Sequence, residues 1–151
     1  MVNDALLEST IMHLVRPEDL QHHGTLFAGQ MAKWLVEAGF IAASRLCGKP
    51  EDVVCVQLYQ MTFEQPVNNG DIIEIKSRVA HVGSASITIY SQVFRGLDAV
   101  PLVSNMATFV TVDKGNKPYN HGLKLSEEYI AKNRDIYMKA LKIREPNNRT
   151  T

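Results

Sequence analysis

Hydrophobic side chains cover most of the circumference of one predicted helix, which runs from about residue 27 to residue 47. A helix that is apolar on nearly every face is buried inside its protein. Gly48 and Pro50 follow the last apolar residue and are expected to end the helix. Small residues recur along it and would let a β-sheet pack closely, namely Ala28, Gly29, Ala32, Ala38, Gly39, Ala42 and Ala43. The pattern therefore predicts one long central helix.

The remaining apolar runs have the composition or the alternation of β-strands. Within residues 72–82, Ile73 and Ile75 fall on one face and charged residues on the other, which is the pattern of a half-buried strand. Prolines and turn-forming residues separate the runs, and Gly83-Ser84 is expected to form a two-residue hairpin. Strands are thus predicted over residues 10–15, 53–63, 72–82, 86–94 and 103–112.

A last helix is predicted over about residues 126–142, because Ser126 is suited to cap it and acidic residues follow in its first turn. One apolar helix followed by four long strands is best satisfied by a curved antiparallel β-sheet that wraps around the helix. The chain is therefore expected to be a single α+β domain over residues 1–151, with its core over about 10–123. The sheet would have an exposed edge strand, which favours dimerisation.

Composition narrows the class of protein. Sixteen basic and sixteen acidic residues balance, so no overall field attracts nucleic acid or an anionic membrane. Cys47 and Cys55 form no disulfide framework and are expected to be reduced thiols. The N-terminal segment lacks the features of a secretory signal, and no apolar run nears the ~20 residues that span a bilayer. We therefore expect a soluble, cytoplasmic protein that binds neither nucleic acid nor a membrane.

Candidate chemistry lies where a histidine-bearing loop enters the central helix. The first turn of a helix leaves backbone N–H groups unpaired and carries partial positive charge, which suits an oxyanion that forms at a carbonyl. In this chain those groups belong to Ala28 and Gly29. Glu37 is the one carboxylate of the predicted helix and follows about two turns later, where it is a candidate general base or a nucleophile that forms a transient anhydride. This combination suits hydrolysis of an activated carbonyl such as a thioester.

Several motifs occur in one order along the chain. They are Arg16–Leu20, His22–Gly29, Trp34–Ala38, the run VQLYQMTFEQPVNNGDIIEIKSRVAHVGSAS, and MATFVTVDKGNKP. In this order, and over roughly residues 12–123, they resemble the hotdog-fold acyl-CoA thioesterases. The resemblance implies a hotdog fold, a homodimer or a higher homo-oligomer such as a tetramer or hexamer, and hydrolysis of acyl-CoA at the subunit interface. It implies no metal and no cofactor, because coenzyme A is part of the substrate.

Three positions depart from the pattern of that family. Gln21 stands where asparagine is common, Ala28 stands where glycine is usual at the helix start, and Val36 stands where the catalytic aspartate is usual. The next residue, Glu37, matches a glutamate of the family. One residue of offset turns a side chain by ~100° about the helix axis. Glu37 is therefore not assumed to take the place of the missing aspartate.

Each candidate side chain also has a plain structural explanation. Glu37 shares one polar stripe with Gln30 and Lys33 and is spaced for an ordinary i, i+4 pair with Lys33. Gln21 or His23 would position a water or hold the carbonyl, whereas loop histidines are commonly only solvated. The chain lacks the second ligand cluster that a zinc site needs. The candidate catalytic groups are Glu37, Gln21, His23 and the N–H groups of Ala28 and Gly29.

Other residues are candidates for contacts with the substrate. Gly83, Ser84 and Ser86 match a segment that touches the pantetheine arm in relatives, although a plain hairpin turn explains them equally well. Thr25 lies in the loop before the helix and is included with the substrate-binding group. Arg78 is suited to a phosphate of coenzyme A, unless it is only a solvated charge on a strand.

The leading hypothesis is hydrolysis of acyl-CoA, with the carbonyl oxygen on the N–H groups of the helix start and Glu37 activating water. Two alternatives stay open. A hydratase or dehydratase of the same fold would pair a loop histidine, His23, with the helix carboxylate. A chain with Val36 in place of the usual acid would instead bind acyl-CoA without turning it over. Acyl chain length does not follow from the sequence, because pocket depth depends on how strands of two subunits meet.

Overall fold

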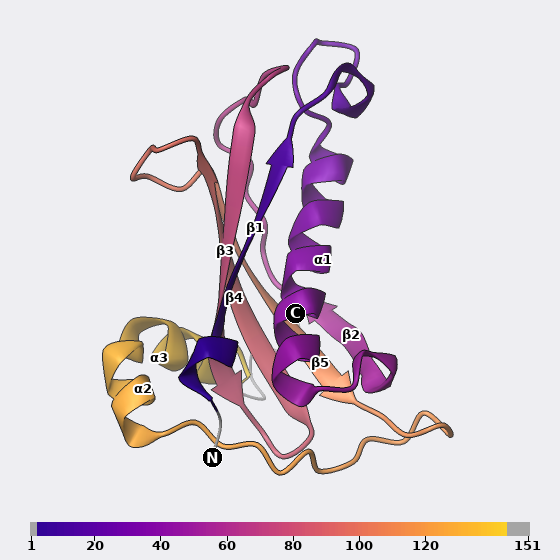
Figure 1. Cartoon of the computed structure of the whole chain (residues 1–151), viewed down its shortest axis with the longest axis vertical. Coiled ribbons are helices and arrows are strands. Elements are labelled where there is room, and N and C mark those ends of the chain that lie inside the picture. The colour runs from indigo at the N-terminus through magenta and orange to yellow at the C-terminus, as the bar shows by residue number, and fades with distance from the viewer. Residues whose placement is uncertain (1–2, 145–151) are drawn as a thin grey trace.

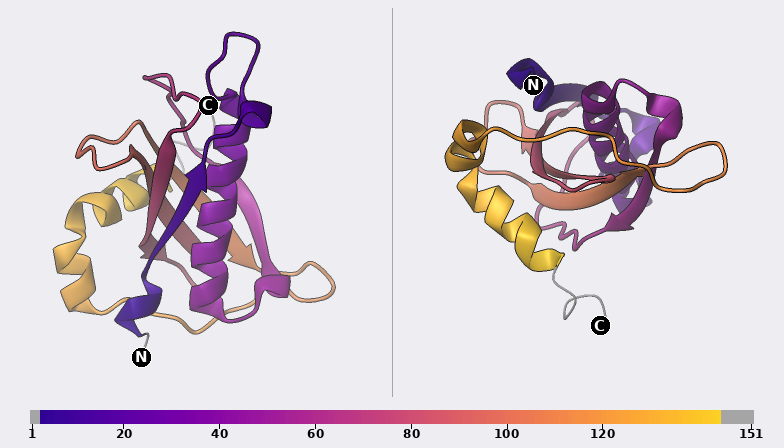
Figure 2. Two further views of the ribbon diagram at one scale, coloured as in Figure 1. Left: turned by 45° about the horizontal axis from the view of Figure 1, so that its top comes forward. Right: turned by 90° about the horizontal axis from the view of Figure 1, so that it is seen from below.

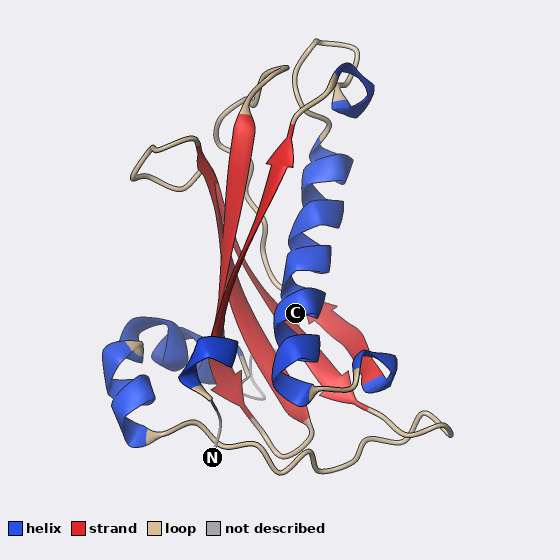
Figure 3. Ribbon diagram, viewed as in Figure 1, coloured by secondary structure: helices blue, strands red, loops and turns tan. Residues whose placement is uncertain are grey.

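The structure, a computed structural model, describes residues 3–144 (Figure 1). One long helix lies along a five-stranded sheet, and two short helices follow it (Figure 3). The helices are α1 (Ala28–Cys47), α2 (Glu127–Lys132) and α3 (Arg134–Ile143), and the strands are β1 (Glu8–Leu14), β2 (Val53–Leu58), β3 (Ile72–Val82), β4 (Ser86–Arg95) and β5 (Val103–Thr111). No helix within residues 3–144 has the length and apolar character to cross a bilayer.

The five strands pair antiparallel in the order β1-β3-β4-β5-β2. The sheet curves around α1, and α3 packs against its opposite face (Figure 2). This is the curved antiparallel sheet that the hydrophobic pattern predicts. Strands β1 and β2 are its edges. On β2, Val56 is 56% exposed and Leu58 is 47% exposed. This edge therefore offers apolar side chains and unpaired backbone groups to another chain.

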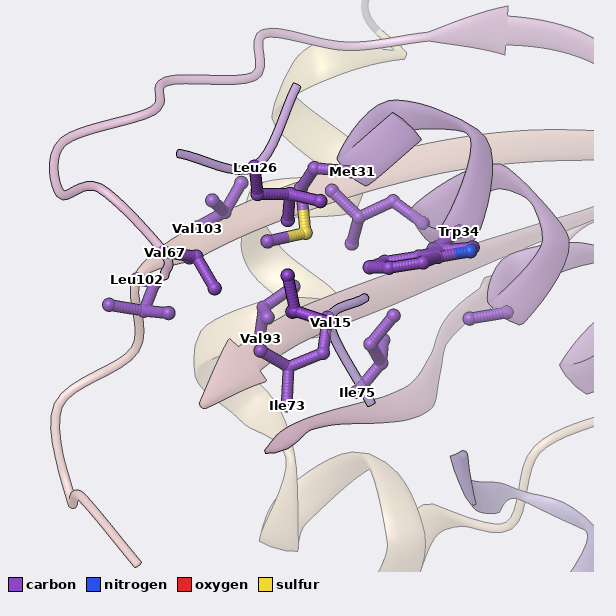
Figure 4. Packing of buried hydrophobic residues seen from close by; sticks show 12 residues of the cluster. Val15, Leu26, Met31, Trp34, Val67, Ile73, Ile75, Val93, Leu102 and Val103 are labelled. Carbon is purple, nitrogen blue, oxygen red and sulfur yellow. The ribbon is translucent and has the colours of Figure 1, made fainter. Parts of the chain in front are cut away.

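The core fills the space between α1 and the inner face of the sheet. Trp34 of α1 lies above Ile75, and Ile73 lies in the same cluster; both isoleucines are fully buried, as the alternation predicts (Figure 4). Further along the helix, a Cβ on Gly39 would lie 3.1 Å from Cζ of Phe109. A side chain there would require the Phe109 ring to shift by a few tenths of an ångström, so glycine suits the close approach of this ring to the helix.

The strand predicted over residues 53–63 ends early, at Leu58. The N–H of Tyr59 still donates to the O atom of Met106 at 2.9 Å, but the chain then leaves the sheet. Residues 62–66 are exposed. The prediction is wrong here because pairing with β5 stops where Leu58 lies opposite Ala107, although β5 itself begins at Val103. The O atom of Tyr59 instead accepts Nδ2 of Asn105 at 2.8 Å.

The C-terminal helix predicted over residues 126–142 is two helices. Ser126 caps the first as predicted, and its Oγ accepts a hydrogen bond from the N–H of Tyr129 at 3.1 Å. Asn133 then interrupts the helix with φ −118° and ψ 30°. Its Nδ2 donates to the O atom of Tyr129 at 3.0 Å, and its Oδ1 accepts from Arg78 at 2.8 Å. An asparagine side chain that bonds to nearby backbone competes with the helical ladder, so the single helix is a wrong prediction.

Candidate functional site

The loop before α1 is closed by its own hydrogen bonds. The N–H of Gln21 donates to the O atom of Thr25 at 2.8 Å, and the N–H of Gly24 donates to the O atom of Gln21 at 2.9 Å. The side-chain Nε2 of Gln21 also donates to Oγ1 of Thr25 at 2.8 Å. Gly24 has φ +84°, which glycine adopts without strain. The loop thus holds two predicted site residues, Gln21 and Thr25, against each other beside the helix start.

The first turn of α1 presents two backbone N–H groups, those of Ala28 and Gly29, with no acceptor in the described part of the chain. Phe27 precedes the helix without a side-chain cap, and its own N–H donates to the O atom of Asp19 at 3.0 Å. The N–H of Gln30 is satisfied by the O atom of Phe27 at 3.0 Å. Ala28 and Gly29 are exposed. With the helix dipole, this turn is able to stabilise an oxyanion.

An aromatic ring borders this turn. The Phe27 ring lies so close to Gly29 that a Cβ there would collide with it. The ring remains 55% exposed, so it covers one side of the helix start without belonging to the core. Because Gly29 has no side chain, the Phe27 ring can lie close to it, and the N–H group of Gly29 stays accessible.

Asp19 is a site residue that the sequence reasoning missed. Its side chain is buried, and its Oδ2 accepts the N–H of Arg16 at 2.9 Å while its Oδ1 accepts Nε2 of Gln30 at 2.9 Å. Burial by itself raises the pKa of the carboxyl, but these two hydrogen bonds and the positive charges of Arg16 and His13 hold the pKa below its ordinary value. Asp19 is therefore an ionised carboxylate beside the first turn of α1.

Two pockets adjoin the helix start, and Gln21 lines both. The first, of about 420 Å³, is polar and is lined by Glu18, Asp19, Leu20, Gln21, His22, Phe27 and Gln30. The second, of about 270 Å³, is the more apolar of the two; Leu26, Ala28, Met31, Phe63, Pro66, Val67 and Val103 line it together with the polar Gln21, Thr25, Glu64 and Gln65. Four of these apolar side chains lie together in Figure 4, namely Leu26, Met31, Val67 and Val103. Ala28 thus borders the second pocket, and its neighbours Phe27 and Gln30 border the first.

Glu37 is exposed and forms no hydrogen bond or ion pair with another residue of the range 3–144. The predicted pair with Lys33 is therefore absent, and Gln30 turns toward Asp19 instead of joining a polar stripe. Glu37 lies eight residues beyond Gly29, which is about 12 Å along the helix axis. Its carboxylate does not reach the start of its own helix.

His22 and His23 stack on each other in the loop, with ring centroids 4.0 Å apart and planes tilted by 41°. Both are exposed. The described residues show no contact between His23 and Glu37, and they contain no group of three or more histidine, cysteine or acidic residues placed to hold a metal ion. His22 lines the polar pocket, so this histidine is the one that the structure brings nearest to the site.

The hairpin that carries Gly83, Ser84 and Ser86 lies at the other end of the sheet from the helix start (Figure 1). Residues 83–85 join β3 to β4, and the N–H of Gly83 donates to the O atom of Ser86 at 3.0 Å, which leaves two residues, Ser84 and Ala85, inside the closed turn. The hydroxyl of Ser86 is buried against Gly83, where a Cβ would collide with it. Since the 20 residues of α1 span about 30 Å, one chain does not bring this hairpin to its own helix start.

Arg78 has structural partners in this chain. Its Nη1 donates to Oδ1 of Asn133 at 2.8 Å, and its guanidinium lies 5.7 Å from the centre of the Tyr90 ring. These contacts attach the junction of α2 and α3 to β3. A contact of Arg78 with a phosphate of the substrate stays a prediction.

Comparison with known proteins gives one consistent result. The sequence model of the thioesterase superfamily matches residues 23–101. Over 108 residues, the chain is 26% identical to the uncharacterized acyl-CoA thioester hydrolase YkhA of Bacillus subtilis. This alignment covers 69% of this chain and 62% of the relative. Over 116 residues, it is 28% identical to the uncharacterized acyl-CoA thioester hydrolase ZMO0511 of Zymomonas mobilis. This alignment covers 74% of this chain and 76% of the relative.

Among solved structures, the hexameric thioesterase y2039 of Yersinia pestis superposes with a TM-score of 0.67 and 28% sequence identity, over 73% of this chain and 91% of that one. The fold of this chain is therefore similar to that of a known thioesterase.

Proposed function

The chain belongs to the thioesterase superfamily, and we propose that it hydrolyses acyl-CoA thioesters to the free acid and coenzyme A. Its hotdog fold agrees with the resemblance seen in the sequence. The observation that carries the proposal is the pair of unpaired N–H groups of Ala28 and Gly29, on a turn where Ala28 borders one pocket while Phe27 and Gln30 border the other. Two backbone donors at a helix start are suited to the oxygen of a thioester carbonyl as it gains negative charge.

The acyl chain would lie in the apolar pocket of about 270 Å³. Leu26, Met31, Val67 and Val103 line it and are each at most 8% exposed. Burial of an acyl chain against such side chains contributes about 0.8 kcal/mol per CH₂ group. Glu64 at the pocket edge disfavours an acyl group with a terminal carboxylate, because like charges would be brought close together.

A second copy of the chain would complete the site. Glu37 lies too far from its own helix start to act there, so the base is assigned to Glu37 of the partner subunit. The exposed edge β2, with Val56 and Leu58, is the surface where two copies would pair. The same pairing would supply the hairpin of Gly83 and Ser84 from the partner subunit to the pantetheine arm. We therefore propose a homodimer at least, and the hexameric relative supports a larger assembly.

In the proposed reaction, water attacks the carbonyl carbon while the two N–H groups hold the carbonyl oxygen. Gln21 lines both pockets and would hold the thioester between them. The C–S bond then breaks, and the proton taken up by Glu37 of the partner subunit passes to the leaving sulfur. This chemistry uses no metal and no organic cofactor. A cytoplasmic location stays a prediction.

The test is a series of acyl-CoA esters of increasing chain length, with release of the free thiol followed by a thiol-reactive dye. The proposal expects saturable release for at least one ester. Absence of release above background from every ester would refute it.

Val36 favours one alternative, because it removes the carboxylate that the family usually carries at that position of the helix. The chain would then bind acyl-CoA without hydrolysing it. Calorimetry with the same esters separates the two cases. If an ester binds as tightly as free coenzyme A and no thiol is released, the chain is a binding protein.

A further inference from the structure

Asp19 and Gln30 form a hydrogen-bonded pair at the start of α1 that the proposed reaction does not yet use. Nε2 of Gln30 donates to Oδ1 of Asp19 at 2.9 Å. Asp19 is only 4% exposed, and its other oxygen accepts the N–H of Arg16 at 2.9 Å and lies 3.8 Å from Nε of that arginine. Both carboxylate oxygens thus accept a hydrogen bond within the chain, and burial keeps Asp19 from meeting a substrate directly.

The pair fixes which way the Gln30 amide points. A carboxylate accepts hydrogen bonds and donates none, so the nitrogen of the amide must face Asp19. The carbonyl oxygen Oε1 must then point away from Asp19, and it has no hydrogen-bond partner within residues 3–144. Gln30 therefore presents a single acceptor whose direction is set by a buried negative charge.

Gln30 lines the polar pocket and belongs to the same helical turn as the two N–H donors. Gln30 and Asp19 both line the pocket of about 420 Å³. Gln30 directly follows Gly29 on the first turn of α1, so the acceptor and the donors belong to the same turn. A carbonyl oxygen held by the N–H groups would place its carbon within the reach of a water bound to Gln30.

We propose that Gln30 orients the attacking water through Oε1 and that Asp19 is the positioning residue that holds and polarises the Gln30 amide. The inference rests on the proposed hydrolysis and adds to it. The water donates one hydrogen bond to Oε1 and gives its other proton to Glu37 of the partner subunit as the C–O bond forms. That proton passes to the sulfur when the C–S bond breaks. Gln30 keeps its own protons throughout, because an amide oxygen is too weak a base to take one.

Asp19 makes this arrangement stronger than a free glutamine would. A negative charge beside the amide N–H pushes electron density toward the carbonyl oxygen, and hydrogen bonds of a chain strengthen one another in a partly buried site. The low pKa of Asp19 means that the charge is present at neutral pH. This chain has Val36 where the family usually has an aspartate. In the proposed site, the oriented amide oxygen of Gln30 holds the water and so compensates in part for that missing carboxylate.

The experiment compares Gln30→Leu, Asp19→Asn and the double variant with the wild-type protein, and Lys33→Ala is the control on the exposed side of the same helix. Thiol release gives kcat and KM for the best acyl-CoA ester. Hydroxylamine is then added as a second nucleophile, and the hydroxamate is measured beside the free acid. Hydroxylamine attacks thioesters without a base, so its reaction needs the carbonyl site but not an oriented water.

We expect Gln30→Leu to lower kcat for hydrolysis roughly 100-fold, the size of loss that a misplaced reactant produces, with KM little changed. The ratio of hydroxamate to acid should rise by about the same factor, which a damaged fold would not cause. The double variant should hydrolyse no more slowly than Gln30→Leu alone, because Asp19 acts only through Gln30. Lys33→Ala should behave as the wild type.

Wild-type rates in Gln30→Leu would overturn the inference and leave the proposed hydrolysis standing. Equal losses of acid and hydroxamate would also overturn it, since the defect would then lie in the carbonyl site or the fold. Additive losses in the double variant would show that Asp19 does not act through Gln30. If the wild-type protein released no coenzyme A from any ester, the proposed function itself would fail and this inference with it.

Discussion

Replacing Ala28 with proline removes one N–H group from the start of α1 and changes little else. Ala28 is the first residue of the helix, and proline is well accepted there because its fixed φ suits the first turn. The residue before a proline must be extended, and Phe27 already has φ −65° and ψ 129°. The N–H of Ala28 has no acceptor in the described chain, so no intramolecular hydrogen bond is lost.

The structure sets the size of the expected effect. Because the native backbone already has the conformation that proline needs, the free energy of unfolding should stay the same or rise by about 0.4–1 kcal/mol. Catalysis should suffer much more. Loss of one oxyanion donor removes about 3 kcal/mol of transition-state stabilisation, which is on the order of 100-fold in kcat. The substitution therefore separates stability from activity.

The assay measures kcat and KM for Ala28→Pro by thiol release, with thermal unfolding and light scattering as checks on fold and assembly. Ala28→Gly is the matched control, because it changes the side chain and keeps the N–H group; it should retain activity near that of the wild type. A folded, correctly assembled Ala28→Pro protein with wild-type kcat would refute the role of this N–H group. Equal losses in both variants would show that the side chain matters and the donor does not.

Three further predictions concern other contacts of the chain. Glu37→Gln should lower kcat on the order of 100-fold or more without lowering the melting temperature, because the side chain is exposed and unpaired among the described residues; an active variant would exclude it as the base. Ser77→Ala should lower the free energy of unfolding in urea by about 1–3 kcal/mol, because it leaves the buried hydroxyl of Ser91 without its 2.7 Å partner. The double variant that also changes Ser91 should recover part of that loss, and an additive loss would count against the pair. Val56→Lys on the β2 edge should give inactive monomers by light scattering, whereas an intact oligomer would place the interface elsewhere.

The parts of the fold that the sequence predicted correctly depend on local causes. Helix α1 begins within one residue of its predicted start and ends at Cys47, because its apolar surface, Gly48 and Pro50 act where they stand in the chain. The alternation of residues 72–82 likewise identifies the buried face of β3. The wrong boundaries depend on distant partners. Asn133 breaks the last helix where it meets Arg78, 55 positions earlier in the chain.

The candidate site divides in the same way. The unpaired N–H groups of Ala28 and Gly29 follow from the absence of a capping side chain at Phe27, which is visible in the sequence. The polarity of Gln30 and the motif around Asp19 were visible too, but nothing local indicates that they meet. Only the closed path of the loop brings the buried carboxylate of Asp19 to the first turn of the helix.

The sequence by itself thus determined that one apolar helix is buried under a sheet and that its first turn faces a polar loop, because periodicity and capping act over a few residues. The tertiary structure decided which acid lies beside that turn and that the Gly83 hairpin is at the opposite end of the sheet. Such distances depend on how the whole chain folds back on itself, and no short stretch of residues carries that information.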